Sequence, residues 1–349
     1  MAKEERVYLG QALVGRELDP IPAEITVKGG MISSVYELKS APAVWICPAF
    51  FDAHTHLGDT IAMDIPCRGT ISELVTPPDG LKHRLLARVR REDLIGGMRA
   101  SVEYMMAGGV AGFADFREGG VAGVLALREA TRGLGCRPVI LGREGGEEIA
   151  DGVGISSTRD VSDAREIAVR AKAADKLVAV HAGERDPFDI EEAIGLDPDL
   201  IVHCTHAEEG HLRECAERRI PIAVCPRSNW IMGVTASPDR PPIRRMLELG
   251  CTVLLGTDNA MFVQPDMFRE LSFTSTVYRV DPKVLLRAAI EGASYLASPH
   301  FIEPKNRACF FLIRPEGSNL RYSHDICATI VKRVSGCEIG ENLLFASHE

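Results

Sequence analysis

Two histidines one residue apart end an apolar run in the first part of the sequence. Residues 48–57 read PAFFDAHTHL and place imidazoles at His54 and His56. Alternate side chains of a strand point to the same side, so both rings can reach one metal ion at a strand end. An isolated pair of this kind is equally compatible with a polar strand end. Its meaning therefore depends on the residues that accompany it.

Three later apolar runs also end in groups that can bind a metal. LVAVH ends at His181, with Glu184 three residues further on, and LIVH ends at His203. CTVLLGT is followed directly by Asp258. In a barrel the carboxyl ends of the strands open to one mouth, where such folds carry their active sites. Together with the first pair, these residues predict one catalytic centre.

The elements that must position these groups are short apolar runs that alternate with helical patterns. This alternation is typical of βα units and a parallel sheet. The expected strands are 44–51, 109–115, 138–141, 152–156, 177–180, 200–202, 221–224 and 251–255. Helical patterns follow most of them, for example at 161–173, 209–218 and 265–278. The link 142–151 is too short for a full helix, but the whole segment has the size of a (β/α)8 barrel, about 250 residues.

Both ends of the chain have a different pattern, that of short strands and tight turns. The strand-like runs are 6–14, 24–28, 31–36, 308–313 and 326–334. Gly29-Gly30 supplies a hairpin turn between two of them. Neither end can bury a sheet alone. We therefore expect 1–47 and 303–349 to form one small β-sandwich beside a barrel of 48–302.

Composition narrows the class of protein further. The 349 residues are 46% hydrophobic and 26% charged, with a formal net charge of −9, which disfavours a nucleic-acid binder. No apolar run approaches the roughly 18 residues of a membrane span, and the first residues lack the apolar core of a signal peptide. The ten cysteines are scattered without a CxxC pair, as expected of free thiols. These features predict a cytoplasmic protein with a small-molecule substrate, and a homo-oligomer is compatible with them.

Taken together, the motifs resemble the amidohydrolase superfamily, in particular its branch of cytosine, guanine and S-adenosylhomocysteine deaminases and triazine chlorohydrolases. The resemblance covers nearly the whole chain. It rests on HTH at 54–56, HxxE at 181–184, VHC at 202–204, CPxSN at 225–229 and GTDN at 256–259. Each motif alone is weak, but the set in this order is specific.

The resemblance implies a role for each chemical group. The implied ligands of one divalent metal ion are His54, His56, His181 and Asp258. Zinc is the expected ion, and iron or manganese also suits such ligands. Glu184 is the implied proton shuttle, and His203 the implied contact to the attacking oxygen or the substrate. Asp258 also accepts a proton from the water.

Several absences sharpen this prediction. Two-metal relatives bridge their ions with a carboxylated lysine at the end of the fourth strand, or with an acid nearby. Neither 138–142 nor 152–158 contains a lysine, so one ion is expected, with Glu147 or Glu148 as the fallback bridging acids. The HExxH of zinc proteases and the PCxxC of cytidine deaminases are both missing.

Five further residues are candidate substrate contacts: Arg68, His206, Arg227, Asn229 and Trp230. Arg68 lies in the long connection 58–84, and a long loop at the active face of a barrel is often functional. Arg227 departs from the small or neutral residue of relatives and either holds an anionic group of the substrate or forms a salt bridge to a neighbouring loop. Trp230 either stacks on a flat ring or belongs to the core, and His206 faces away from His203 if the strand continues. The remaining histidines read as surface residues: His83, His211, His300, His324 and His348.

This set of groups predicts hydrolytic deamination of an aminated nitrogen heterocycle, purine-, pyrimidine- or nucleoside-like, with release of ammonia. The metal lowers the pKa of a bound water, and Glu184 protonates the ring nitrogen. The same machinery suits a cyclic amidase of the imidazolonepropionase kind or a chlorohydrolase. A barrel that serves only as a scaffold is the remote alternative, because such relatives lose ligands that this chain keeps.

Overall fold

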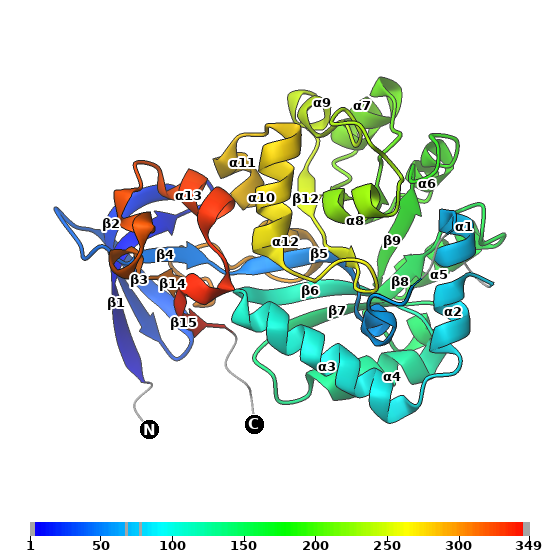
Figure 1. The fold of residues 1–349 in the computed structure, drawn as a ribbon, viewed down its shortest axis with the longest axis horizontal. Coiled ribbons are helices and arrows are strands. Elements are labelled where there is room, and N and C mark those ends of the chain that lie inside the picture. Colours follow the sequence, from blue (N-terminus) through cyan, green and yellow to red (C-terminus); the bar gives the residue numbers. More distant parts are fainter. Residues whose placement is uncertain (1–3, 67–68, 77–78, 345–349) are drawn as a thin grey trace.

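A computed structural model describes residues 4–66, 69–76 and 79–344, which form two β-sheets and the helices around them (Figure 1). The larger sheet occupies the middle of the chain, and the smaller one brings the two ends together at one side of the molecule (Figure 1). No helix in these ranges is long and apolar enough to cross a membrane.

The larger sheet has nine parallel strands in the order β12-β11-β10-β9-β8-β7-β6-β5-β13. Their bounds are β5 Phe50–His56, β6 Val110–Arg117, β7 Arg137–Gly142, β8 Gly152–Ile155, β9 Leu177–Ala182, β10 Leu200–His203, β11 Ile222–Val224, β12 Val253–Leu255 and β13 Asp258–Asn259. The two edge strands, β12 and β13, are separated in the chain by only Gly256 and Thr257. The sheet must therefore curl until its edges approach each other.

The two faces of the curled sheet have separate hydrophobic cores. Phe51, Phe116, Leu141 and Val202 belong to a small inner cluster with residues of β9, β11 and β12. The intervening side chains face the surrounding helices and form the main core. This alternation explains why several strands are apolar along almost their whole length, because such strands are covered on both faces.

The helices connect consecutive strands and cover the outside of the sheet (Figure 1). Those of the barrel region are α1 Ile71–Leu74, α2 Leu81–Leu86, α3 Arg91–Ala107, α4 Gly120–Thr131, α5 Ala164–Ala173, α6 Ile190–Gly195, α7 Glu209–Glu217, α8 Pro226–Ile231, α9 Ile243–Glu248, α10 Met267–Tyr278, α11 Pro282–Ala288 and α12 Gly292–Leu296. The helices expected at 161–173, 209–218 and 265–278 are confirmed as α5, α7 and α10. The link 142–151 holds only the short 3-10 turn Gly146–Glu148, as its length predicted.

The smaller sheet has six strands in the order β15-β14-β4-β1-β2-β3. Their bounds are β1 Glu5–Val14, β2 Asp19–Lys28, β3 Met31–Glu37, β4 Trp45–Pro48, β14 Phe310–Ile313 and β15 Ile339–Leu343. The antiparallel pairing of β4 with β14 joins the two ends of the chain, as expected. The described strands form one continuous sheet here, where the sequence suggested a sandwich.

Three local expectations are wrong. The run 44–51 is two strands of different sheets, because β4 ends at Pro48 and β5 starts at Phe50. The run 326–334 is a helix, α13 Ile326–Arg333, whose buried Cys327, Ile330 and Val331 recur with a helical period. His300 is buried instead of exposed, and its Nε2 lies 2.7 Å from the carbonyl oxygen of Ala49.

The closure between β12 and β13 predicts an effect of substituting Gly256. A Cβ there would lie 2.7 Å from Cβ and 2.9 Å from the backbone nitrogen of His54. Gly256→Ala should therefore lower the free energy of unfolding by about 1–3 kcal/mol in chemical denaturation. Gly96→Ala is the control, because Gly96 lies in α3 with open space around its Cα, and alanine should stabilise that helix by about 0.5–1 kcal/mol. If both variants lost the same amount of unfolding free energy, β5 would not approach Gly256 as closely as these distances state.

Candidate metal centre and active site

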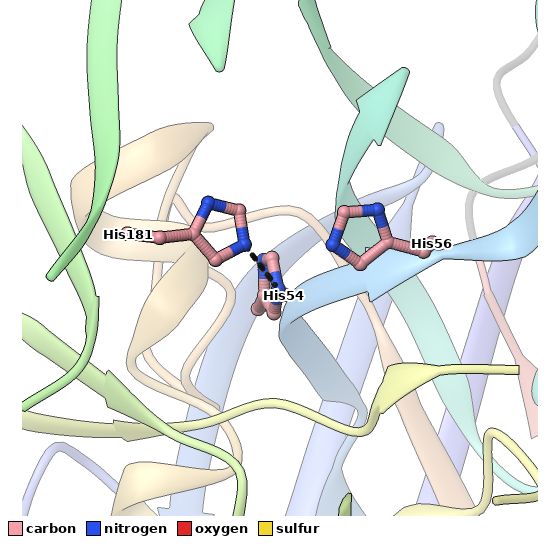
Figure 2. A group of neighbouring side chains, drawn as sticks. All are labelled: His54, His56 and His181. Atoms are coloured by element: carbon pink, nitrogen blue, oxygen red, sulfur yellow. Dashed lines mark hydrogen bonds between the residues drawn. The ribbon is translucent and has the colours of Figure 1, made fainter. Parts of the chain in front are cut away.

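Three imidazoles from two strands turn toward one another at the carboxyl end of the larger sheet (Figure 2). His54 and His56 come from β5, and His181 comes from β9. Nε2 of His54 lies 3.2 Å from Nε2 of His181 and 3.2 Å from Oδ1 of Asp258. Nε2 of His56 lies 3.6 Å from the same carboxylate oxygen. Two overlapping groups of three residues could each hold a metal ion: His54-His56-His181 and His54-His203-Asp258. Within each group, one nitrogen or carboxylate oxygen per residue lies within 4.8 Å of the other two.

The backbone that carries these groups is held in unusual conformations. Asp258 and His203 have φ angles of 66° and 77°, in the left-handed region that non-glycine residues rarely adopt. Such residues cost about 1–3 kcal/mol each and persist where the surroundings fix them. The buried carboxylate of Asp52 supplies part of that fixation, because it accepts hydrogen bonds from the backbone and hydroxyl of Thr257 and from the backbone of His54. Asp52 thus ties β5 to the residue that precedes Asp258.

Burial sets the charge states of the ligand groups. It lowers the pKa of His54 and His181, and it lowers that of His56 to about 3 with help from the nearby Lys82 ammonium. For Asp258, burial acts to raise the pKa, but the hydrogen bond with His54 and the surrounding imidazoles hold it well below its usual range. Neutral imidazoles and an ionised carboxylate are the forms that ligate a metal. The donor set therefore fits a divalent ion and leaves room for water in its coordination.

Hydrogen bonds at the opposite side of two rings fix which nitrogen faces the cluster. Nδ1 of His181 lies 3.1 Å from the carbonyl oxygen of Ile155, to which it donates. Nδ1 of His56 lies 3.0 Å from Oε1 of Glu118. Partners of this kind orient metal-binding histidines and raise their basicity. Ser228 does the same for the carboxylate, because its hydroxyl donates to Oδ2 of Asp258 at 2.6 Å.

Glu118 belongs to a buried network of charges that the sequence did not reveal. Its carboxylate lies 2.8 Å from Nζ of Lys82 and 2.7 Å from Nη2 of Arg117. Lys82 also lies 2.8 Å from Asp59, and Arg117 lies 3.2 Å from Asp115. Charged residues at the end of the apolar run 110–117 were a signal that could have located Arg117 and Glu118. Lys82 gave no such signal, because it comes from a short helix in the long connection after β5.

Glu184 and His203 lie beside the ligand cluster. Nε2 of His203 is 3.7 Å from Oε1 of Glu184, and both residues line the same cavity as His56, His181 and Asp258. Burial raises the pKa of Glu184 above its usual value, which favours a carboxyl group that can hold and release a proton. The structure thus gathers the predicted catalytic residues around one cavity.

The expected substrate contacts that the structure describes are not gathered there. Arg68 lies outside the described residues. Nη1 of Arg227 donates to the carbonyl oxygens of Gln264 and Asp266 and lies 3.5 Å from Glu270. Arg227 thus forms a salt bridge, but its partner lies in helix α10 and not in a neighbouring loop. Its side chain, like that of Trp230, lines a different cavity.

The other aromatic and polar candidates also have partners within the protein. Nε1 of Trp230 donates to the hydroxyl of Tyr278 at 2.8 Å, as expected of a residue at the edge of the core. Asn229 is buried, and its amide nitrogen donates to the Thr205 hydroxyl at 2.7 Å. His206 is half-buried and does not line the cavity of the ligand cluster.

Comparison with known proteins agrees with this geometry. The model of the amidohydrolase family matches residues 45–315, and the chain belongs to this family. It is thereby an enzyme of the class that hydrolyses carbon–nitrogen bonds other than peptide bonds. The resemblance inferred from the motifs is confirmed.

Two relatives and one solved structure illustrate the match. A protein of Methanothermobacter thermautotrophicus, provisionally named an aminohydrolase, is 32% identical over 84% of this chain and 87% of its own length. A 5-methylthioadenosine/S-adenosylhomocysteine deaminase of Pelotomaculum thermopropionicum is 24% identical over 90% of this chain and 86% of its own. The crystal structure of an adenosine deaminase from Xanthomonas campestris with bound zinc has a TM-score of 0.80 at 16% identity, over 98% of this chain and 93% of that one.

The role of Glu118 in orienting His56 generates a prediction. Glu118→Gln keeps the shape of the side chain but removes its charge, so it should weaken metal binding about 10- to 100-fold. Competition with a chelator of known affinity measures this change. Glu148→Gln is the matched control, because Glu148 is an exposed acid of the 146–148 turn and should leave metal affinity unchanged. If Glu148→Gln weakened metal binding and Glu118→Gln did not, Glu148 would be the acid associated with the metal, and Glu118 would have no such role.

Proposed function

We propose that this protein is a hydrolytic deaminase that converts the C–NH2 group of a nitrogen heterocycle into a carbonyl and releases ammonia. The substrate is an aminated purine-, pyrimidine- or nucleoside-like ring. One zinc ion, held by His54, His56, His181 and Asp258, is the proposed cofactor, and the zinc-bound fold neighbour supports this choice. The observation that carries the proposal is the half-buried Glu184 in the cavity of the ligand cluster, beside His203.

The chemistry divides among the residues of the cavity. Bound by His54, His56, His181 and Asp258, a divalent ion would lower the pKa of a water so that it loses a proton near neutral pH. Asp258 accepts this proton, and Glu184 delivers a proton to the ring nitrogen next to the C–NH2 carbon, so that negative charge does not build up there. His203 hydrogen-bonds the oxygen that adds to this carbon and holds it in line. The proton held by Asp258 then passes to the amino nitrogen, and the carbon–nitrogen bond breaks with release of ammonia. The hydroxyl proton returns to Glu184 as the carbonyl forms.

We also propose the wider organisation in which this reaction takes place. The curled sheet is the wall of a (β/α)8 barrel of residues 48–302, and 1–47 with 303–349 form the accessory β domain. The inner hydrophobic cluster and the approach of β12 to β13 support a closed barrel. The described cysteines are all free, which supports a reducing, cytoplasmic location.

Release of ammonia is the direct test of the proposed reaction. The zinc-loaded protein should release one ammonia per ring carbonyl formed from at least one member of a panel of aminated purines, pyrimidines, pterins and nucleosides. Coupled ammonia detection and mass spectrometry measure both products. Ring opening without ammonia, on any cyclic amide that is turned over efficiently, would transfer the protein to the cyclic-amidase alternative, and chloride release from a chlorotriazine would favour the chlorohydrolase alternative.

The role of Glu184 is tested separately. General acid–base groups contribute about 10²–10⁴-fold, so Glu184→Gln should lower kcat by about this factor, while elemental analysis finds the metal content unchanged. Glu192→Gln, at an exposed position of α6, should leave both quantities as they are. Loss of metal in the Glu184 variant would make this residue a ligand, and near-normal turnover would assign the proton transfer to another group.

A further inference from the structure

Among the described residues that line the active-site cavity, Arg143 carries two hydrogen-bond donors without a partner. Arg143 follows β7 directly and lines the cavity together with His56, His181 and Glu184. Its side chain is only 11% exposed. Nε and Nη2 are buried, and neither has a hydrogen-bond partner within the described part of the chain. An unsatisfied buried donor lowers the stability of the fold, and more so if it is charged, so two on one side chain call for an explanation.

The other contacts of Arg143 hold its guanidinium group in place. Nη1 lies 3.9 Å from Oε1 of Glu118, beyond hydrogen-bond distance but close enough for attraction. The guanidinium carbon lies 5.8 Å from the centre of the Phe116 ring, in the range of a cation–π contact. Phe116 in turn packs against His181, with ring centres 4.5 Å apart. The guanidinium is thus anchored on one side and leaves Nε and Nη2 open.

The other two cations that line the cavity have near partners. Lys82 lies 2.8 Å from both Asp59 and Glu118. Arg185 donates from Nη2 to the Thr76 hydroxyl at 3.0 Å and to Asp160 at 3.2 Å. Arg143 therefore differs from both in its capacity to bind an additional acceptor.

Nε and Nη2 form one edge of a guanidinium, with two nearly parallel N–H bonds. This edge matches the two oxygens of a carboxylate, and the resulting paired hydrogen bonds are short and charge-assisted. A lysine at this position would offer a point charge without the paired geometry. We propose that Arg143 binds a carboxylate of the substrate through Nε and Nη2. The substrate is then an aminated heterocycle that carries a carboxylate, an assignment that rests on the proposed deaminase function.

The experiment uses matched pairs of probes that differ only in the charge of one group. The first pair is cytosine-5-carboxylate and cytosine-5-carboxamide, and the second is adenosine-5′-carboxylate and adenosine-5′-carboxamide. The two pairs place the carboxylate close to the ring or beyond a ribose. Isothermal titration calorimetry on the zinc-loaded protein gives Kd for each probe, and ammonia release is measured in parallel. Arg143→Gln and Arg143→Lys are compared with Arg185→Gln, a guanidinium of the same cavity that already has partners.

In at least one pair, the native protein should bind the carboxylate about 10- to 100-fold more tightly than the carboxamide. Arg143→Gln should reduce this ratio to near unity, and Arg143→Lys should restore only part of it, while Arg185→Gln retains the full preference. If Arg143→Gln does not fold or loses its metal, the native protein is compared with Arg143→Lys instead. The preference for carboxylate over carboxamide should then be about 10-fold lower in Arg143→Lys.

Three results would overturn the proposal: no carboxylate preference in either pair, a preference that survives in the Arg143 variants, or a preference that depends on Arg185 instead. The second of these is the result expected if the carboxylate binds the metal itself. An Arg143-dependent preference without ammonia from any probe, or from the wider panel of aminated heterocycles, would leave this binding site in place and contradict the proposed reaction alone.

Discussion

The buried carboxylate of Asp258 is the group on which the arrangement of the active site depends. An ionised carboxylate away from water is stable only among donors or cations. Here the donors are the Ser228 hydroxyl at 2.6 Å and the imidazole of His54 at 3.2 Å, with His56 at 3.6 Å. The imidazoles come from β5 and the hydroxyl from α8, which follows β11, so the carboxylate in β13 meets these donors only if the sheet closes around it. A divalent ion bound at this cluster would stabilise the ionised carboxylate further, because ligand bonds would replace its weak contacts with neutral imidazoles.

The larger sheet is built to meet this constraint. Asp258 is placed by a break between two strands, where Gly256 approaches His54 and Thr257 is held by the carboxylate of Asp52. Burial raises the pKa of Asp52 to about 7, so this carboxyl is itself costly to ionise and is retained for its hydrogen bonds. Left-handed backbone at His203 and Asp258 adds further local strain. The hydrophobic cores inside and outside the sheet supply the stability that offsets these costs.

The alternation of apolar runs predicted most of the strands, and the polar residues at the ends of four runs predicted one catalytic centre. The assignment of individual ligands came from the resemblance to the amidohydrolase motifs. Side chains alternate along a strand, and the carboxyl ends of parallel strands meet at one face of the sheet, with few exceptions to either rule. No comparable rule tells which side chains of distant loops and helices come into contact. The sequence therefore could not show that Lys82 reaches Glu118, or that Arg227 is held by Glu270 while Arg143 keeps a free edge. The helix at 326–333 was missed because its β-branched residues suit a strand equally well.

The central claim is that one divalent ion is bound by this cluster. Anomalous diffraction at the zinc edge, on crystals of the zinc-loaded protein, tests it most directly. The account predicts one strong peak per chain at about 2.0–2.2 Å from Nε2 of His54, His56 and His181 and from a carboxylate oxygen of Asp258. A peak at some other group of residues, or two peaks of equal strength bridged by Glu147 or Glu148, would contradict it.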